Sequence, residues 1–221
     1  MNYSSLSELS LSIKEKLTKV YHNTIGRFIS SLFKKPARIL FLGIDNAGKT
    51  TLVNKLKYNT NHIYMPTKHA KNTELQIGNL KANILDIGGH KAARIAWNKY
   101  VINADGIVFI VDISDHERYR EVQQAWSTVL ELEKDAPILV LMNKVDTSSH
   151  TPQSAELDTA FKERIQSATQ ITGFGNPGQA VKIVYLSIIN EDINKESTPL
   201  RSGFSWLGGI INERSKAKDM Q

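Results

Sequence analysis

The 221-residue sequence contains no cysteine, which excludes disulfide bridges and cysteine-ligated zinc as sources of stability. It has no apolar run close to the roughly 18–20 residues that a membrane-spanning helix needs. The first residues lack the charged start, apolar stretch and small-residue cleavage site of a signal peptide, and Asn2 stands where N-myristoylation requires glycine. We therefore expect neither a membrane span nor an N-terminal myristoyl group.

A strong excess of charge is absent from most of the sequence. The net charge is +6, but residues 1–38 hold seven Lys or Arg residues and two Glu residues, a net +5, which leaves +1 for the remainder. The basic character therefore belongs to an N-terminal arm, and the pattern does not indicate a basic groove for nucleic acid. The composition, 41% hydrophobic and 23% charged, is ordinary for a globular chain with one core.

Residues 1–36 show a helical pattern of apolar residues. Spacings of three and four separate the members of this stripe, and most lysines lie off it. The stripe consists of Leu6, Leu9, Ile13, Leu17, Val20, Thr24, Phe28 and Leu32. Pro36 ends the pattern, since proline cannot continue a helix. An apolar face beside a basic flank predicts an amphipathic helix that binds a membrane surface. A helix docked permanently on the rest of the chain and a solvated coil are the alternatives.

Beyond Pro36, short apolar runs alternate with helical patterns. We expect strands at residues 37–42, 82–87, 106–113, 138–142 and 182–188. Helices are expected near residues 49–58, 92–102, 117–134, 154–168 and 203–214. Polar loops are expected at residues 173–179 and 190–202. Residues 73–77 and 80 onward, separated by Gly78-Asn79, predict an antiparallel hairpin at the sheet edge. Trp126, Phe161 and Trp206 are expected in the core. The pattern indicates an α/β fold, with a mostly parallel six-stranded sheet flanked by helices.

The first motif lies between the first predicted strand and the first predicted helix of this region. Residues 43–50 read Gly-Ile-Asp-Asn-Ala-Gly-Lys-Thr, which satisfies the pattern GxxxxGK followed by Ser or Thr at every fixed position. Such glycines let backbone N–H groups turn around phosphate oxygens, the lysine neutralises the β- and γ-phosphates, and the hydroxyl ligates Mg²⁺. The residues assigned to this phosphate loop are Asp45, Asn46, Ala47, Gly48, Lys49, Thr50 and Thr51. A plain glycine turn is the alternative, which the full match in the right context disfavours.

Two further positions supply candidate ligands for Mg²⁺ beside Thr50. Asp86 opens the pattern Asp-Ile-Gly-Gly at the end of a predicted strand, where its carboxylate can hold Mg²⁺ and the N–H of Gly89 can reach the γ-phosphate. The pattern is weak alone and strong on the next parallel strand after a phosphate loop. Thr67 lies in the loop before the hairpin, from which a threonine can reach Mg²⁺ when a γ-phosphate is present. This assignment of Thr67 depends on the family spacing given below.

Asn143, Lys144 and Asp146 follow the predicted strand 138–142 in the pattern Asn-Lys-x-Asp. A carboxylate at the last position can accept hydrogen bonds from the ring N–H and the exocyclic amine of guanine together, and adenine offers no such donor pair on that edge. After a phosphate loop, this pattern favours GTP over ATP. Ser187 and Ile188, at the end of the last predicted strand, are the candidate contacts to the base. The expected ligands are therefore GTP or GDP with Mg²⁺.

These motifs resemble those of the Arf/Sar branch of small GTPases, and within it the Sar-type GTPases of the COPII coat. Asp45 stands where many other small GTPases have glycine, and Thr67 precedes Asp86 by 19 residues, as in that branch. His90 occupies the position where Sar-type proteins have histidine and Arf-like relatives have glutamine. Further matches are Ala93, Arg94, Trp97, Tyr100, residues 107–112 and residues 204–207. The resemblance covers roughly residues 25–212 and implies a P-loop small-GTPase domain at residues 37–215, with a polar tail at residues 216–221.

The resemblance implies an enzyme that hydrolyses GTP to GDP and phosphate. His90 would orient the attacking water, with Lys49 and Thr67 as the other catalytic residues. No arginine finger is evident in the sequence, so hydrolysis should be slow alone and stimulated by the inner COPII coat subunits. A membrane-bound exchange factor would load GTP. The N-terminal helix would then bind the cytosolic face of the endoplasmic reticulum membrane for transport toward the Golgi.

Some positions depart from the family pattern. Residues 69–75 read His-Ala-Lys-Asn-Thr-Glu-Leu where the family has His-Pro-Thr-Ser-Glu-Glu-Leu, and Ile95 replaces an arginine. These changes leave the nucleotide-binding motifs intact, but they make the partner-binding surfaces less similar to those of the family. Two alternatives therefore stay open. One is another Arf-like trafficking GTPase, against which His90 and Asn2 argue. The other is a GTP-dependent assembly subunit that resembles the receptor for signal recognition particle, for which a membrane span is expected.

Overall fold

The computed structural model describes residues 37–58, 71–77, 80–86, 97–147, 159–192, 195 and 197–219. For residues 57–58, 71–77, 80–86 and 218–219 the description is limited to the backbone. The predicted arm at residues 1–36 and the predicted site residues Thr67, Gly89 and His90 lie outside the described residues.

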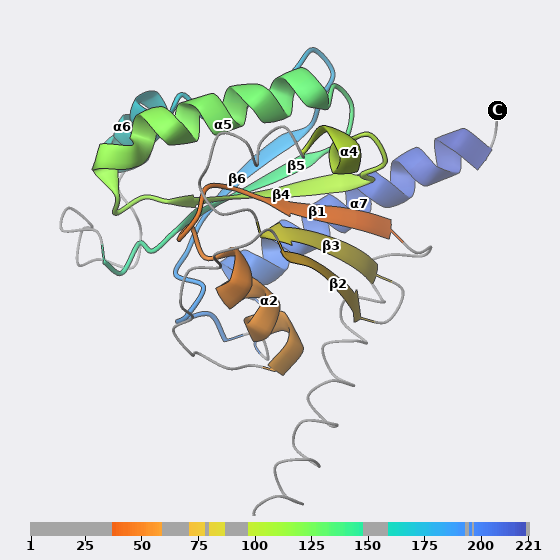
Figure 1. Cartoon of the computed structure of the whole chain (residues 1–221), viewed down its shortest axis with the longest axis horizontal. Coiled ribbons are helices and arrows are strands. Elements are labelled where there is room, and N and C mark those ends of the chain that lie inside the picture. Colours follow the sequence, from red (N-terminus) through yellow and green to blue (C-terminus); the bar gives the residue numbers. More distant parts are fainter. Residues whose placement is uncertain are drawn as a thin grey trace, which may run out of the picture.

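One sheet organises the described part of the chain, with the strand order β2-β3-β1-β4-β5-β6 (Figure 1). The strands are β1 (Ala37–Leu42), β2 (Lys71–Ile77), β3 (Leu80–Asp86), β4 (Gly106–Asp112), β5 (Ile138–Asn143) and β6 (Val181–Tyr185). All neighbouring pairs are parallel except β2 and β3, which pair antiparallel. The expected six-stranded α/β sheet and its edge hairpin are both confirmed.

Helices cover both faces of the sheet (Figure 1). One face carries α2 (Lys49–Tyr58) and α7 (Pro199–Asp219), and the other carries α4 (Asn98–Val101), α5 (Tyr119–Leu132) and α6 (Thr159–Thr169). A 3-10 turn, η1 (His116–Arg118), leads directly into α5. Residues 92–96 and 154–158, where two of the helices were expected to begin, lie outside the described residues.

Side chains of the central strands are buried on both faces, as expected for a doubly covered parallel sheet. Ile39 and Phe41 pack in the cluster that contains α2 and α7, whereas Leu40 and Leu42 pack in the cluster that contains α4, α5 and α6. The aromatic residues expected in the core are Trp126 and Phe161, both buried, and Trp206, which is partly buried against the first cluster. The core therefore lies on both faces of the sheet.

The last strand is shorter than the sequence predicts, because β6 ends at Tyr185 and not at residue 188. The Leu186 N–H still donates to the Met142 carbonyl oxygen at 3.0 Å, but the Ile188 N–H donates to Asn143 Oδ1 at 3.0 Å. A side chain thus replaces the neighbouring strand as hydrogen-bond acceptor, and the backbone leaves the sheet.

The last helix is longer than the sequence predicts. It begins at Pro199, so the predicted loop 190–202 is wrong at its end, and it runs to Asp219, so residues 216–219 of the predicted tail are helical. Thr198 Oγ1 accepts a hydrogen bond from the Arg201 N–H at 3.2 Å, and proline suits the first helical position because its missing N–H needs no partner there. A threonine followed by proline is a helix start signal.

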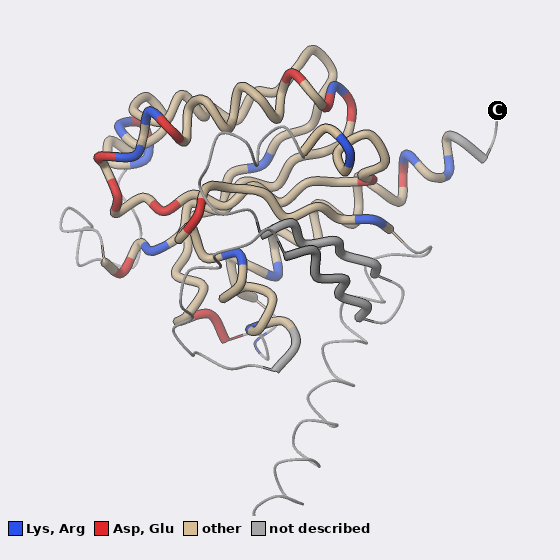
Figure 2. Tube along the Cα trace, viewed as in Figure 1, with Lys and Arg blue, Asp and Glu red and all other residues tan. Residues whose placement is uncertain are grey.

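Acidic and basic positions are interspersed along the described trace (Figure 2). No helix among the described residues is both long enough and apolar enough to cross a bilayer.

Candidate functional site

The predicted motifs meet at one edge of the sheet. The phosphate loop follows β1, Asp86 ends β3, the Asn-Lys-x-Asp motif begins at the last residue of β5, and Ser187 and Ile188 follow β6. Because these four strands are parallel, their carboxyl ends lie on the same side. This is the edge at which open α/β sheets bind ligands.

The phosphate loop requires both of its fixed glycines. Gly43 has a φ of 140° and Gly48 a φ of 110°, conformations that side chains disfavour. A Cβ atom at position 43 would overlap the Ile110 carbonyl oxygen of β4, and one at position 48 would overlap the Asn143 side-chain amide. Asn46 adopts the left-handed conformation with a φ of 60°, which asparagine tolerates well. The phosphate loop therefore lies in close contact with β4 and with Asn143, the first residue of the Asn-Lys-x-Asp motif.

Lys49 places a buried positive charge inside the phosphate loop. Its side chain is 3% exposed, and Nζ donates to the carbonyl oxygens of Gly43 at 3.0 Å and Ile44 at 2.7 Å. Lys49 is also the first residue of α2, so the backbone N–H groups of the first helical turn lie beside it. An enclosed cation next to a helix N-terminus fits a phosphate group.

Thr50 and Thr51 follow Lys49 in the first turn of α2, and both are partly buried. Asp86 is the last residue of β3, which lies next to β1, so its backbone reaches the edge where Thr50 is located. A hydroxyl and a carboxylate are the oxygen ligands that Mg²⁺ prefers. The chemistry of this donor set fits Mg²⁺; Thr67, the third predicted ligand, lies outside the described residues.

Asn143 joins the phosphate loop to the segment after β6 that contains the predicted base contacts Ser187 and Ile188, the base-reading loop. Its side chain is 3% exposed, Nδ2 donates to the Ala47 carbonyl oxygen at 2.9 Å, and Oδ1 accepts from the Ile188 N–H at 3.0 Å. All three residues were predicted separately as ligand contacts. The structure shows that one buried amide ties the loop after β1 to the segment after β6.

Lys144 and Asp146 follow Asn143 in a tight turn. Lys144 has a φ of 66°, and the Thr147 N–H donates to its carbonyl oxygen at 3.1 Å. Lys144 Nζ lies 2.6 Å from Oδ2 of the buried Asp112, and Asp112 Oδ1 accepts from the Ser114 N–H at 3.0 Å and from Ser114 Oγ at 2.6 Å. Asp146 is exposed on this turn.

Asp112 is a site residue that the sequence patterns did not identify. Its signal is an acidic residue that ends β4, at the same edge as the motifs. It holds Lys144 and so orients the turn that carries Asp146.

Ser187 is 8% exposed, and its Oγ has no hydrogen-bond partner within the described part of the chain. A buried unpaired hydroxyl is costly and is often completed by a ligand or a water molecule. The backbone beyond Ile188 is held by Lys55, a second missed residue, whose Nζ donates to the Ile189 carbonyl oxygen at 3.0 Å. Burial lowers the pKa of Lys55, although the charges of Asp192 and Glu191 oppose the change.

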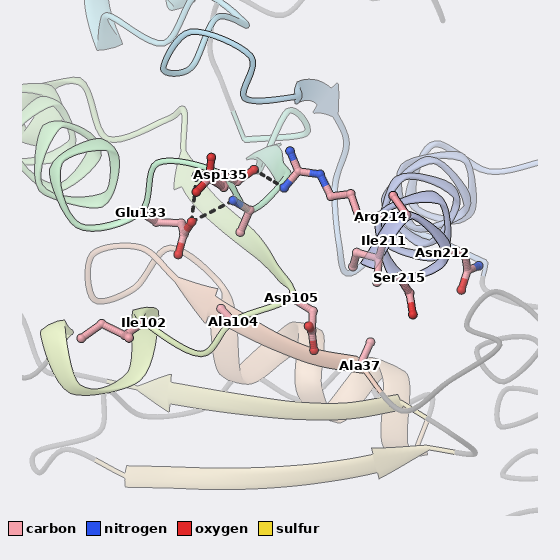
Figure 3. Close-up of a pocket in the computed structure, with 12 residues that line it drawn as sticks. Ala37, Ile102, Ala104, Asp105, Glu133, Asp135, Ile211, Asn212, Arg214 and Ser215 are labelled. Carbon is pink, nitrogen blue, oxygen red and sulfur yellow. Dashed lines mark hydrogen bonds between the residues drawn. The ribbon is translucent and has the colours of Figure 1, made fainter. Parts of the chain in front are cut away.

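A hollow lies at the opposite edge of the sheet (Figure 3). It has a volume of about 520 Å³ and lies between the start of β1, the loops that precede β4 and β5, and the end of α7. Two of its carboxylates, those of Asp105 and Glu133, accept hydrogen bonds within the fold. Asp105 Oδ2 accepts from the Arg38 N–H at 2.7 Å, and Glu133 Oε1 accepts from the N–H groups of Asp135 and Ala136. None of the predicted ligand contacts lines it.

Comparisons with known proteins agree with this arrangement. Residues 25–197 match the ADP-ribosylation factor family, Arf. The small COPII coat GTPase SAR1 of Encephalitozoon cuniculi strain GB-M1 is 49% identical over 210 residues, which cover 94% of this chain and 95% of the relative. The protein of the same name from Giardia intestinalis is 33% identical over 182 residues, covering 81% and 92%. A crystal structure of the Encephalitozoon cuniculi protein in complex with GDP aligns with a TM-score of 0.76 and 48% identity over 96% of both chains.

Proposed function

Because the chain belongs to the ADP-ribosylation factor family and to its Sar-type branch, we propose that it is a small GTPase that cycles between GDP and GTP and initiates COPII coat assembly. The observation that supports nucleotide binding most directly is the Asn143 side chain, which hydrogen-bonds both Ala47 of the phosphate loop and Ile188 of the base-reading loop. A single ligand that contacts one loop with its phosphates and the other with its base would explain why these two loops are tied together.

Each part of the site has a role in the proposed reaction. The N–H groups of residues 45–51 and the buried Lys49 bind the phosphates, and Asp146 identifies guanine. When bound by Thr50, Thr67 and Asp86, Mg²⁺ supplies further neutralisation of phosphate charge. His90, which we propose from its match to the Sar-type pattern in the sequence, orients the attacking water. Such a site works mainly through positioning and electrostatic stabilisation.

Hydrolysis is proposed to need a partner. Arg118 is an arginine that contacts the phosphate loop, but its guanidinium is hydrogen-bonded to Asp45 and Glu121. A second arginine supplied in trans would accelerate hydrolysis by a large factor, on the order of 10³–10⁵ in related chemistry. We propose that the inner COPII coat subunits supply this arginine and that a membrane-bound exchange factor loads GTP.

The N-terminal arm is proposed to attach the GTP-bound protein to the cytosolic face of the endoplasmic reticulum membrane. Its sequence combines an apolar stripe with a net charge of +5 over residues 1–38. Burial of the apolar face and attraction of each basic residue to anionic lipid, about 1 kcal/mol per residue, both favour binding.

Isothermal titration calorimetry tests the proposed ligand. The protein, freed of nucleotide, should bind GDP and a non-hydrolysable GTP analogue in the presence of Mg²⁺, and should bind ATP at least about 1,000-fold more weakly, because adenine leaves Asp146 unpaired. Equal binding of ATP, or no binding of GDP, would refute the proposal. Chelation of Mg²⁺ should weaken the GTP analogue more than GDP, since the γ-phosphate adds charge that the metal offsets.

A liposome flotation experiment tests the arm. The GTP-analogue form should float with vesicles that contain anionic lipid, and deletion of residues 1–30 should abolish flotation without changing GDP affinity. The substitution Leu17→Glu lies on the apolar stripe and should reduce flotation by about tenfold or more, whereas Thr18→Glu makes a similar charge change off the stripe and should have a smaller effect. Equal flotation of all four proteins would rule out the arm as the membrane anchor.

A further inference from the structure

An ion-pair cluster joins the phosphate loop to the start of α5. Arg118, the last residue of η1, donates from Nη2 to Asp45 Oδ1 at 2.5 Å and from Nη1 to the Asp45 carbonyl oxygen at 3.3 Å. The same guanidinium donates from Nε and Nη2 to Glu121 Oε2, at 2.9 and 2.7 Å. The three side chains are 25–33% exposed, so the cluster is partly shielded from water.

Asp45 is a disadvantage for a loop that binds phosphate. Burial raises the pKa of its carboxyl. The hydrogen bond and charge of Arg118, together with the charge of Lys49, lower the pKa by more than burial raises it, so that the pKa lies below its usual value. The carboxylate is therefore ionised at neutral pH. It also lies within electrostatic reach of Lys49, the residue that neutralises the nucleotide phosphates. An uncompensated Asp45 would repel the phosphates and compete for Lys49.

The guanidinium of Arg118 compensates the charge of Asp45. Its planar fork bonds both the side chain and the backbone of Asp45, which fixes the guanidinium against the loop. Glu121 holds the same guanidinium from the first turn of α5. Burial lowers the pKa of Arg118, but the hydrogen bonds and charges of Asp45 and Glu121 outweigh this and raise the pKa above its usual value. The positive charge is thus permanent.

We propose that Arg118 is a positioning residue that neutralises Asp45 and thereby allows the phosphate loop to accept GTP as well as GDP. The inference deepens the proposed function and depends on it. GTP carries about one more negative charge than GDP, so a bare carboxylate at Asp45 penalises GTP more. Loss of Arg118 therefore shifts the protein toward its GDP state, without removing any group that contacts the nucleotide base.

A purely structural role for Arg118 makes a different prediction. If the residue only attaches η1 and α5 to the phosphate loop, its loss should weaken GDP and GTP by the same factor. Removal of the Asp45 charge would then restore nothing. The ratio of the two affinities, and its rescue by a second substitution, separate the two roles.

The test uses the full-length protein and dissociation constants for GDP and a non-hydrolysable GTP analogue, measured with Mg²⁺ at low salt. Arg118→Ala should weaken the GTP analogue about tenfold more than GDP. Arg118→Lys keeps the charge and should change the ratio by less than about threefold. The double variant Asp45→Asn with Arg118→Ala should restore the ratio to within about threefold of the starting protein. Raising the salt concentration should shrink the effect of Arg118→Ala, because partly exposed charges are screened.

Arg120→Ala is the matched control, because it removes the same charge from an exposed position on α5 two residues away. It should leave the affinity ratio unchanged. An unchanged ratio in Arg118→Ala, or a shifted ratio that the double variant fails to restore, would overturn the inference. If the starting protein bound neither nucleotide, the proposed function itself would fail instead, so the two failures are distinguishable.

Discussion

An Asp146→Asn variant should bind GDP at least about 100-fold more weakly than the starting protein and should gain affinity for xanthosine diphosphate. The Asp146 carboxylate is an acceptor only, and guanine presents two donors to it, the ring N–H and the exocyclic amine. An asparagine amide presents one acceptor and one donor group, so one donor of guanine loses its partner. Xanthine has a carbonyl oxygen in place of the amine, which an asparagine N–H can satisfy.

The Asp146→Asn substitution should change base recognition without disturbing the fold. Asp146 is exposed, and the turn that carries it is held by other groups, namely the hydrogen bond from Thr147 N–H to the Lys144 carbonyl oxygen and the ion pair between Lys144 and Asp112. The thermal midpoint without nucleotide should therefore change little. Asp135→Asn is the control, an exposed carboxylate removed at the opposite edge of the sheet, and should leave both affinities unchanged. Unaltered GDP binding by Asp146→Asn would show that another group reads the base.

An Asn143→Ala variant should lose both stability and nucleotide affinity. The substitution leaves the Ala47 carbonyl oxygen and the Ile188 N–H without their partner in a buried region, and it creates a small cavity. Each unsatisfied buried group costs about 1–3 kcal/mol, so the free energy of unfolding should fall by about 2–5 kcal/mol. GDP affinity should fall about 100-fold or more, because the phosphate and base loops no longer keep their spacing.

Asn176→Ala separates the two effects. Asn176 also bridges elements, since its Nδ2 donates to the carbonyl oxygens of Leu130 and Glu133 at 2.9 and 3.1 Å, but it lies in the loop before β6, away from the motifs. Urea unfolding should show a loss of stability in both variants, and calorimetry should show a loss of affinity in Asn143→Ala alone. If Asn176→Ala weakened GDP equally, general destabilisation rather than loop spacing would account for the result.

Much of the fold followed from local patterns in the sequence. The strands at residues 37–42 and 106–112 are apolar except at Arg38 and Asp112, and a parallel sheet covered on both faces needs such runs. The Gly78-Asn79 pair marked the edge hairpin correctly. The end of β6 could not be predicted from such local patterns. Residues 186–188 are as apolar as the strand itself, and the hydrogen bond that draws Ile188 out of the sheet comes from Asn143, 45 residues earlier.

The sequence by itself determined which ligand the protein should bind, because each motif is a contiguous stretch whose residue types and spacing carry the chemistry. The tertiary structure alone decided how the motifs are joined. Asn143 reaches Ala47 across 96 residues, Arg118 reaches Asp45 across 73, and Lys55 reaches Ile189 across 134. Each of these contacts needs only one or two suitable side chains, far apart in the sequence, and leaves no periodic pattern. Only the folded sheet, which brings four strand ends to one edge, shows these pairs.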